Sequence, residues 1–207
     1  MTDYTAFQHL SPTTLADELT RAQVMDLGIR PLWPMMPRVA GPAFPVRCAP
    51  GDNLMLHAAI YRATPGSVIV VEAGDVEYAV AGGNVCAVAQ KRGIAAFVVD
   101  GVIRDLAETR ERGFPVFARG VSPIPGAKHV IDVLNGPVRC GGVEIAPLDI
   151  VVADEEGIVV IPAAQAERVL KNAQARAAKD AVETLEGWEA AHQARIEAIL
   201  RQKGFTG

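Results

Sequence analysis

The stretch GGNVCAVAQKRGIAAFVVDGVIRDLAE, residues Gly82–Glu108, decides the fold that the sequence predicts. It begins as a helix opened by two glycines and continues as an apolar strand over 94–101, which ends in an Asp100-Gly101 turn. A second, short helix over 102–113 follows and contains the tetrad Arg-Asp-x-x-Glu. A buried strand between two helices is typical of α/β proteins with parallel strands.

The flanking segments extend this pattern on both sides. The run SVIVVEAG, residues 67–74, is rich in β-branched residues and predicts a strand that is covered on both faces. FPVFARG, residues 114–120, predicts a third strand. The segment after residue 130 is rich in short strands, with hairpin-like turns at Gly141-Gly142 and Glu156-Gly157.

The two ends of the chain predict helices. Residues 11–28 begin with capping residues and predict an N-terminal helix, whereas the proline-rich segment 29–52 predicts extended chain with at best a short edge strand at 44–48. A further helix is predicted for 53–63. The Ala-, Glu-, Arg- and Lys-rich C-terminal segment predicts one long helix, or two separated near Gly187. We therefore expect an α/β domain over 1–162 and a helical extension over 163–207, which belongs to the same domain or contacts another subunit.

Composition restricts the class of protein. The chain has 207 residues and a net charge of −4, and it has no dense basic patch, so nucleic acid is not expected as a direct ligand. No segment is apolar enough for a membrane span, and the N-terminus does not resemble a signal peptide. The three isolated cysteines, Cys48, Cys86 and Cys140, indicate a reduced, cytoplasmic protein in which each is a buried apolar residue or a reactive thiol.

The tetrad suggests chemistry because of its position. Ligands of parallel α/β sheets gather at the carboxyl ends of strands, and Asp100, Arg104, Asp105 and Glu108 follow such an end. Asp105 and Glu108 are three residues apart, so on a helix they would share one face and could bind Mg²⁺ or Mn²⁺. Arg104 could bind a carboxylate or stabilise an oxyanion. The alternative is an ordinary solvated helix after an ordinary turn.

The glycine pair is the second candidate element. Gly82 and Gly83 precede a helix, and the free N–H groups of Asn84 and Val85 in its first turn would form an anion pocket. A small α-keto acid needs such a pocket for its carboxylate and a metal ion for its ketone oxygen. A double glycine before a helix is also compatible with close packing alone.

The spacing of these residues resembles a known family. Gly83, twenty intervening residues, Arg104-Asp105, two more residues and Glu108 match the pattern G-x20-R-D-x2-E/D. The surrounding segments AQKRGIAAFVVDGVIRD and RERGFPVFARG fit as well. The chain thus resembles, most strongly over 65–160, the family of the class II pyruvate aldolases (4-hydroxy-4-methyl-2-oxoglutarate / 4-carboxy-4-hydroxy-2-oxoadipate aldolases) and of the regulator of ribonuclease E activity.

The resemblance implies a fold, an assembly and a set of roles. It implies a single three-layer swivelling-type α/β/α domain, a homotrimer or hexamer with sites between subunits, and a divalent metal ion, Mg²⁺ or Mn²⁺. Asp105 would bind the metal directly and Glu108 through water, while Arg104 would bind the keto oxygen. Next to Gly83, the amides of Asn84 and Val85 would hold the pyruvate carboxylate. Asp100 belongs to the same motif without a defined role.

The implied reaction is retro-aldol cleavage of a 4-hydroxy-2-oxo acid to pyruvate and a second oxo acid, and the same enolate chemistry would decarboxylate oxaloacetate. The alternatives are a non-catalytic protein that binds and regulates a ribonuclease, and a lyase or hydratase that acts on another keto acid. Acidic residues of a neighbouring subunit would complete the site. The candidates are Asp17, Glu18, Asp180 and Glu183, whereas His57 and His129 are expected to be structural.

Overall fold

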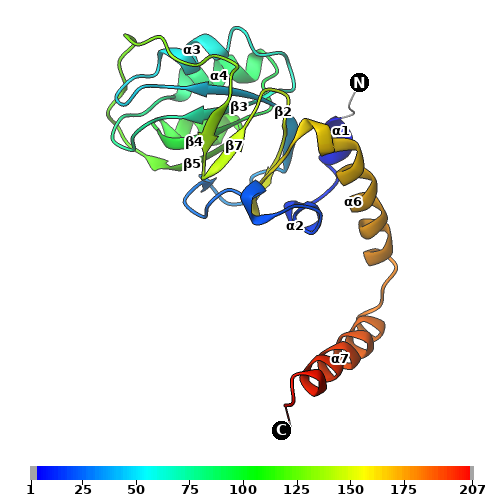
Figure 1. Cartoon of the computed structure of the whole chain (residues 1–207). Helices are drawn as coiled ribbons and strands as arrows, with labels where there is room; N and C mark the ends of the chain where they lie inside the picture. The colour runs from blue at the N-terminus through cyan, green and yellow to red at the C-terminus, as the bar shows by residue number, and fades with distance from the viewer. Residues whose placement is uncertain (1–3, 206–207) are drawn as a thin grey trace. The chain divides into compact units, whose positions relative to one another are not determined.

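The computed structural model describes residues 4–205, which form two compact units: one extends to Ala173 and the other begins at Gln174 (Figure 1). The elements of the first unit are α1 (Tyr4–Phe7), α2 (Pro12–Ala16), η1 (Arg21–Gln23), β1 (Arg30–Pro31), β2 (Val39–Arg47), α3 (Leu54–Ala59), β3 (Val68–Glu72), α4 (Gly83–Lys91), β4 (Ala96–Ile103), α5 (Leu106–Arg112), β5 (Val116–Val121), β6 (Val138–Cys140), β7 (Val143–Ile145), β8 (Ile150–Asp154), β9 (Gly157–Ile161) and η2 (Ala163–Gln165). Helix α6 (Ala166–Asp180) begins in the first unit, and α7 (Leu185–Gln202) lies in the second.

A seven-stranded sheet is the framework of the first unit. Its strand order is β1-β5-β4-β3-β2-β8-β9, and β2, β3, β4 and β5 pair in parallel. The three strands predicted between residues 67 and 120 therefore lie side by side in the centre of the sheet (Figure 1). The hairpins β6–β7 and β8–β9 form at the predicted glycine turns. The predicted α/β class, with an N-terminal helix and a C-terminal helical extension, is confirmed.

The proline-rich segment contradicts the prediction of a short edge strand. Strand β2 has nine residues and lies inside the sheet, between β3 and β8. Its residues 39–42 pair with β8, whereas its residues 43–47 pair with β3. Each half thus pairs with one of these two strands only, so Pro42 and Pro45, which lack an N–H donor, do not interrupt a ladder on both sides.

The predicted turn at Asp100-Gly101 is also wrong. Strand β4 continues to Ile103, and its pairing with β5 shifts register between Val99 and Val102. Gly101 is needed inside this strand because a Cβ there would lie 2.5 Å from the Cβ of Ala73. The end of the strand is therefore displaced by two residues, and α5 begins only at Leu106.

The helices outside the sheet are shorter than predicted. The N-terminal helix ends at Ala16, and Val24 instead forms a bridge to Val159 of β9, so the following chain supports the sheet edge. The helix predicted for 53–63 is reduced to α3. The C-terminal segment forms two helices, but the break comes before Gly187, whose N–H is accepted by the capping hydroxyl of Thr184 at 3.1 Å.

The core is aliphatic, with Phe97 and Phe114 packed edge to face at its centre. All three cysteines are buried, as the apolar alternative predicted, and burial raises the thiol pKa of Cys48 and of Cys86 to about 11. They are therefore protonated and poorly nucleophilic at neutral pH. Among the helices of residues 4–205, none is long and apolar enough to cross a membrane.

Candidate active site

A small cavity of about 90 Å³ lies beyond the carboxyl end of β4 and beside the first turn of α4. Its polar lining residues are Asn53, His57, Asn84, Arg104, Asp105 and Lys128. Three of these belong to the predicted site, and the other three come from segments that the sequence motif does not include. The cavity is therefore the place where the predicted residues meet other polar side chains.

The extended segment 79–81 holds the walls of this cavity together. The N–H of Val80 donates to the carbonyl of Val102 at 3.0 Å, and the N–H of Arg104 donates to the carbonyl of Ala81 at 2.9 Å. On the other edge, the N–H of Gly126 donates to the carbonyl of Ala79 at 3.0 Å. The end of β4 and the loop that leads to Lys128 are thereby fixed on opposite sides of one short segment.

Asp105 does not lie on a helical face with Glu108, which corrects the prediction. It is the N-cap of α5, in the left-handed conformation with φ of 57°, which costs a non-glycine residue about 1 kcal/mol. Its Oδ2 accepts the N–H of Gly83 at 3.0 Å and lies 3.5 Å from Nε of Arg104. The strained backbone thus turns the carboxylate back toward the N-terminus of α4.

The glycine pair brings the two carboxylates together. A Cβ on Gly82 would lie 2.5 Å from Oδ2 of Asp105, and a Cβ on Gly83 would overlap with Oε2 of Glu108. Both carboxylates therefore approach the N-terminus of α4, where the helix dipole favours negative charge. The structure places Asp105 and Glu108 close to the same two residues, although by a different geometry from the one predicted.

Two amides of the first turn of α4 remain available to a ligand. The first helical hydrogen bond runs from the N–H of Cys86 to the carbonyl of Gly82, so the amides before it have no helical partner. Asp105 accepts the amide of Gly83, whereas Asn84 and Val85 line the cavity. The predicted anion pocket is thus geometrically available at these two residues.

The sequence reasoning missed three residues of the cavity. Asn53 is 4% exposed; its Nδ2 donates to the carbonyl of Gly126 at 3.1 Å, while Oδ1 is buried without a protein partner among the described residues. Burial, with a contribution from the charge of Lys128, lowers the pKa of His57 to about 4, so this imidazole is neutral at pH 7. His57, which was expected to be structural, lines the cavity, and its role stays a prediction. No sequence signal links these residues, because only the fold unites residues 53–57 with 128.

The donor set fits a hard divalent cation. In residues 4–205, no group of three or more His, Cys, Asp or Glu side chains could hold a metal ion. Asp105 lines the cavity and Glu108 does not, although the two carboxylates approach the neighbouring residues Gly82 and Gly83; no described residue donates a hydrogen bond to Oδ1 of Asp105. Mg²⁺ is commonly bound by one or two carboxylates and keeps several waters, so this set matches its preference.

The acidic residues considered for a neighbouring subunit lie outside the cavity. Glu18 accepts a hydrogen bond from Asn172 at 2.8 Å, and Asp180 pairs with Arg176 at 2.9 Å within α6. Asp17 and Glu183 are exposed. Their part in a shared site therefore stays a prediction.

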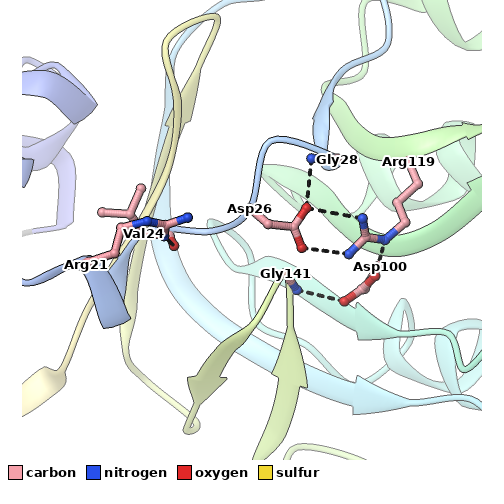
Figure 2. A network of polar contacts seen from close by, with 7 residues as sticks. All are labelled: Arg21, Val24, Asp26, Gly28, Asp100, Arg119 and Gly141. Atoms are coloured by element: carbon pink, nitrogen blue, oxygen red, sulfur yellow. Dashed lines mark hydrogen bonds and ion pairs between the residues drawn. The ribbon is translucent and has the colours of Figure 1, made fainter.

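Asp100 belongs to a separate ionic network rather than to the cavity lining (Figure 2). Its Oδ1 accepts Nε of Arg119 at 2.5 Å, and its Oδ2 accepts the N–H of Gly141 at 2.7 Å. The same guanidinium binds both oxygens of Asp26, at 3.1 and 2.8 Å. These hydrogen bonds hold the pKa of Asp26 below its ordinary value. Asp100 thus connects β4, β5 and the β6–β7 turn.

Arg119→Met is expected to lower the free energy of unfolding by about 2–3 kcal/mol, because the half-buried carboxylate of Asp100 loses its charged donor. Urea unfolding at pH 7 measures this loss. The matched control is Arg139→Met, whose only ion pair in the described chain is an exposed 3.9 Å contact with Glu144 and which should cost less than about 1 kcal/mol. Equal stabilities of the two variants would contradict the role of the network.

Comparison with known proteins identifies the family of this chain. The family described as RraA-like (Aldolase/RraA) matches residues 12–160. A relative from Halalkalibacterium halodurans, named "Putative 4-hydroxy-4-methyl-2-oxoglutarate aldolase", is 42% identical over 177 residues, which are 85% of this chain and 84% of the relative. The 4-hydroxy-4-methyl-2-oxoglutarate aldolase of Thermus thermophilus is 31% identical over 112 residues, 54% of this chain and 68% of the relative.

The fold has solved counterparts in the same family. RraAS2 of Streptomyces coelicolor, described as an unusual member of the RNase ES inhibitor RraA protein family, aligns with a TM-score of 0.75 and 28% identity. The alignment covers 92% of this chain and 94% of that protein. The family that the Gly-x20-Arg-Asp-x2-Glu spacing indicated is confirmed, and the chain belongs to the RraA-like family of aldolases and RraA proteins.

Proposed function

We propose that the chain catalyses the retro-aldol cleavage of a 4-hydroxy-2-oxo acid to pyruvate and a second oxo acid, assisted by Mg²⁺ or Mn²⁺. One observation supports this most: Arg104, Asp105 and the free amides of α4 line the same small cavity. The names of the aldolase relatives support the reaction class. Asp105 would hold the cation directly and Glu108 through water, and a cation there would act as a Lewis acid on the ketone.

Each part of the proposed substrate has a binding partner among the residues of the cavity. The amides of Asn84 and Val85 bind the carboxylate next to the ketone, at the positive end of α4. The guanidinium of Arg104 donates to the C2 keto oxygen. Lys128 adds a second positive charge to the same cavity and binds the anionic substrate. These donors together favour a short keto acid with its carboxylate toward α4.

The bond cleavage follows from this placement. A base removes the proton of the C4 hydroxyl, the C3–C4 bond breaks, and its electron pair moves into C2–C3 while charge develops on the C2 oxygen. Arg104 faces that oxygen and stabilises the charge. A positioned water molecule accepts the proton, since burial lowers the pKa of His57 to about 4 and makes this imidazole a weak base; protonation of C3 then releases pyruvate. Oxaloacetate would form the same enolate by direct loss of its C4 carboxylate as CO₂, with no hydroxyl proton to remove.

Pyruvate release measured with lactate dehydrogenase and NADH tests this proposal. The protein is assayed with 4-hydroxy-4-methyl-2-oxoglutarate and with oxaloacetate, first with Mg²⁺ or Mn²⁺ and then with EDTA. We expect turnover that EDTA abolishes and that added cation restores. Absence of turnover on every 4-hydroxy-2-oxo acid and on oxaloacetate would reject the proposal.

A second candidate function rests on the solved relatives, since the RraA of Thermus thermophilus is described as an RNA-processing inhibitor and RraAS2 as an unusual member of the RNase ES inhibitor family. This chain would then bind a ribonuclease without catalysis. Inhibition of a purified ribonuclease E-type enzyme, together with no turnover of any keto acid, would favour this function. Turnover of a keto acid other than the two tested classes would instead favour a different lyase or hydratase.

Lys128→Ala is expected to raise KM about tenfold and to change kcat less, because the substrate carboxylate is charged in both the ground state and the transition state. Steady-state kinetics at saturating Mg²⁺ separate the two constants. Lys91→Ala is the control, since Lys91 is exposed at the end of α4 and outside the cavity. A KM equal to that of the control would remove Lys128 from substrate binding.

A further inference from the structure

Helix α7 has a narrow apolar stripe that stays exposed in the described part of the second unit. Leu185, Trp188, Ile196 and Ile199 recur at helical spacing, so their side chains lie along one face. They are 74%, 48%, 39% and 36% exposed. His192 fills the gap in the stripe and stacks on Trp188 with ring centroids 4.6 Å apart. The stripe is therefore continuous over the whole helix.

This helix has little to stabilise it alone. None of its eighteen residues is buried, whereas most of the stability of a protein helix comes from the packing of an amphipathic face. Its sequence nevertheless has a helix cap, provided by Thr184, which accepts the N–H of Gly187. A capped amphipathic helix without buried residues is typical of a segment that packs against a partner.

The charges along the helix indicate which partner. The N-terminal half, together with Glu183, has only acidic charges, at Glu186 and Glu189. The C-terminal half and its cap are net basic. Their charged residues are Arg195, Glu197, Arg201 and Lys203. Two copies side by side in opposite directions would place acidic halves against basic halves and would also oppose the two helix dipoles. A parallel pair or a threefold bundle would place like charges together.

We propose that α7 pairs in antiparallel orientation with α7 of a second copy of this chain and buries the stripe at a twofold interface. Such a contact is self-complementary, because each copy contributes the same surface. It does not depend on the proposed enzymatic function.

Light scattering coupled to size exclusion tests the pairing on the full chain. Ile196→Ala/Ile199→Ala keeps helix propensity and shortens the stripe, so we expect half of the wild-type mass at micromolar concentration. Gln193→Ala/Glu197→Ala, which lies away from the stripe, should keep the wild-type mass. Circular dichroism verifies that both variants are folded. An unchanged mass in the stripe variant would overturn the proposal and assign this face to another partner.

Cross-linking tests the orientation. Leu185 and Lys203 lie at opposite ends of α7, and the native cysteines are buried. With a short bis-maleimide, Leu185→Cys/Lys203→Cys should form covalent dimers, whereas Leu185→Cys alone should not, because its counterpart in an antiparallel pair is Lys203. Dimers in the single variant would show a parallel arrangement and overturn the proposal.

Discussion

Arg104→Lys should lower kcat by about 10²-fold or more in the pyruvate-release assay, comparable to the loss of an oxyanion donor. A planar guanidinium can donate to the keto oxygen while it remains beside Asp105, 3.5 Å from its carboxylate. A lysine keeps the charge but loses the fork geometry, so stabilisation of the developing oxyanion is lost. Because the interaction strengthens in the transition state, kcat should fall more than KM rises.

The control for this prediction is Arg110→Lys, an exposed position in α5 outside the cavity. It should leave both constants unchanged. The Arg104 side chain is 43% exposed, so the thermal unfolding temperature should be similar in both variants. If Arg104→Lys turned over substrate at nearly the wild-type rate, Arg104 would have no role at the keto oxygen.

Asp105→Ala is expected to lower Mg²⁺-dependent turnover by about 10³-fold, because it removes the carboxylate proposed to hold the cation directly. Binding of Mn²⁺, followed by electron paramagnetic resonance of the free ion, should weaken in parallel. This second readout does not depend on activity. It therefore shows whether the variant loses turnover because it no longer binds the cation.

Asp105→Asn distinguishes the negative charge of Asp105 from its hydrogen bond with Gly83. An asparagine can still accept the N–H of Gly83 and tolerates the left-handed conformation, so it should retain stability while it loses Mn²⁺ binding. Asp105→Ala should in addition lose about 1 kcal/mol of stability, because it removes the acceptor of the Gly83 N–H. Glu111→Gln, at an exposed position in α5, is the control for charge alone. Normal Mn²⁺ binding in Asp105→Asn would contradict the proposed ligand.

The central strands and α4 could be predicted because local sequence determines them. A continuous β-branched run such as Val68–Val71 is stable only when covered on both faces, and a glycine pair before an apolar segment favours the start of a helix. Strand β2 could not be predicted, because its two prolines are tolerated only through a change of partner strand in mid-length. That change depends on β8, about 110 residues further along the chain.

The sequence by itself determined the family and the residues of the motif, because the spacing of Gly83, Arg104, Asp105 and Glu108 is a local property of the chain. Only the tertiary structure decided how they meet. A strand that extends two residues further and a left-handed Asp105 turn the carboxylate onto α4, and the fold brings Asn53, His57 and Lys128 to the same cavity. Contacts between distant segments depend on packing, which no local pattern encodes.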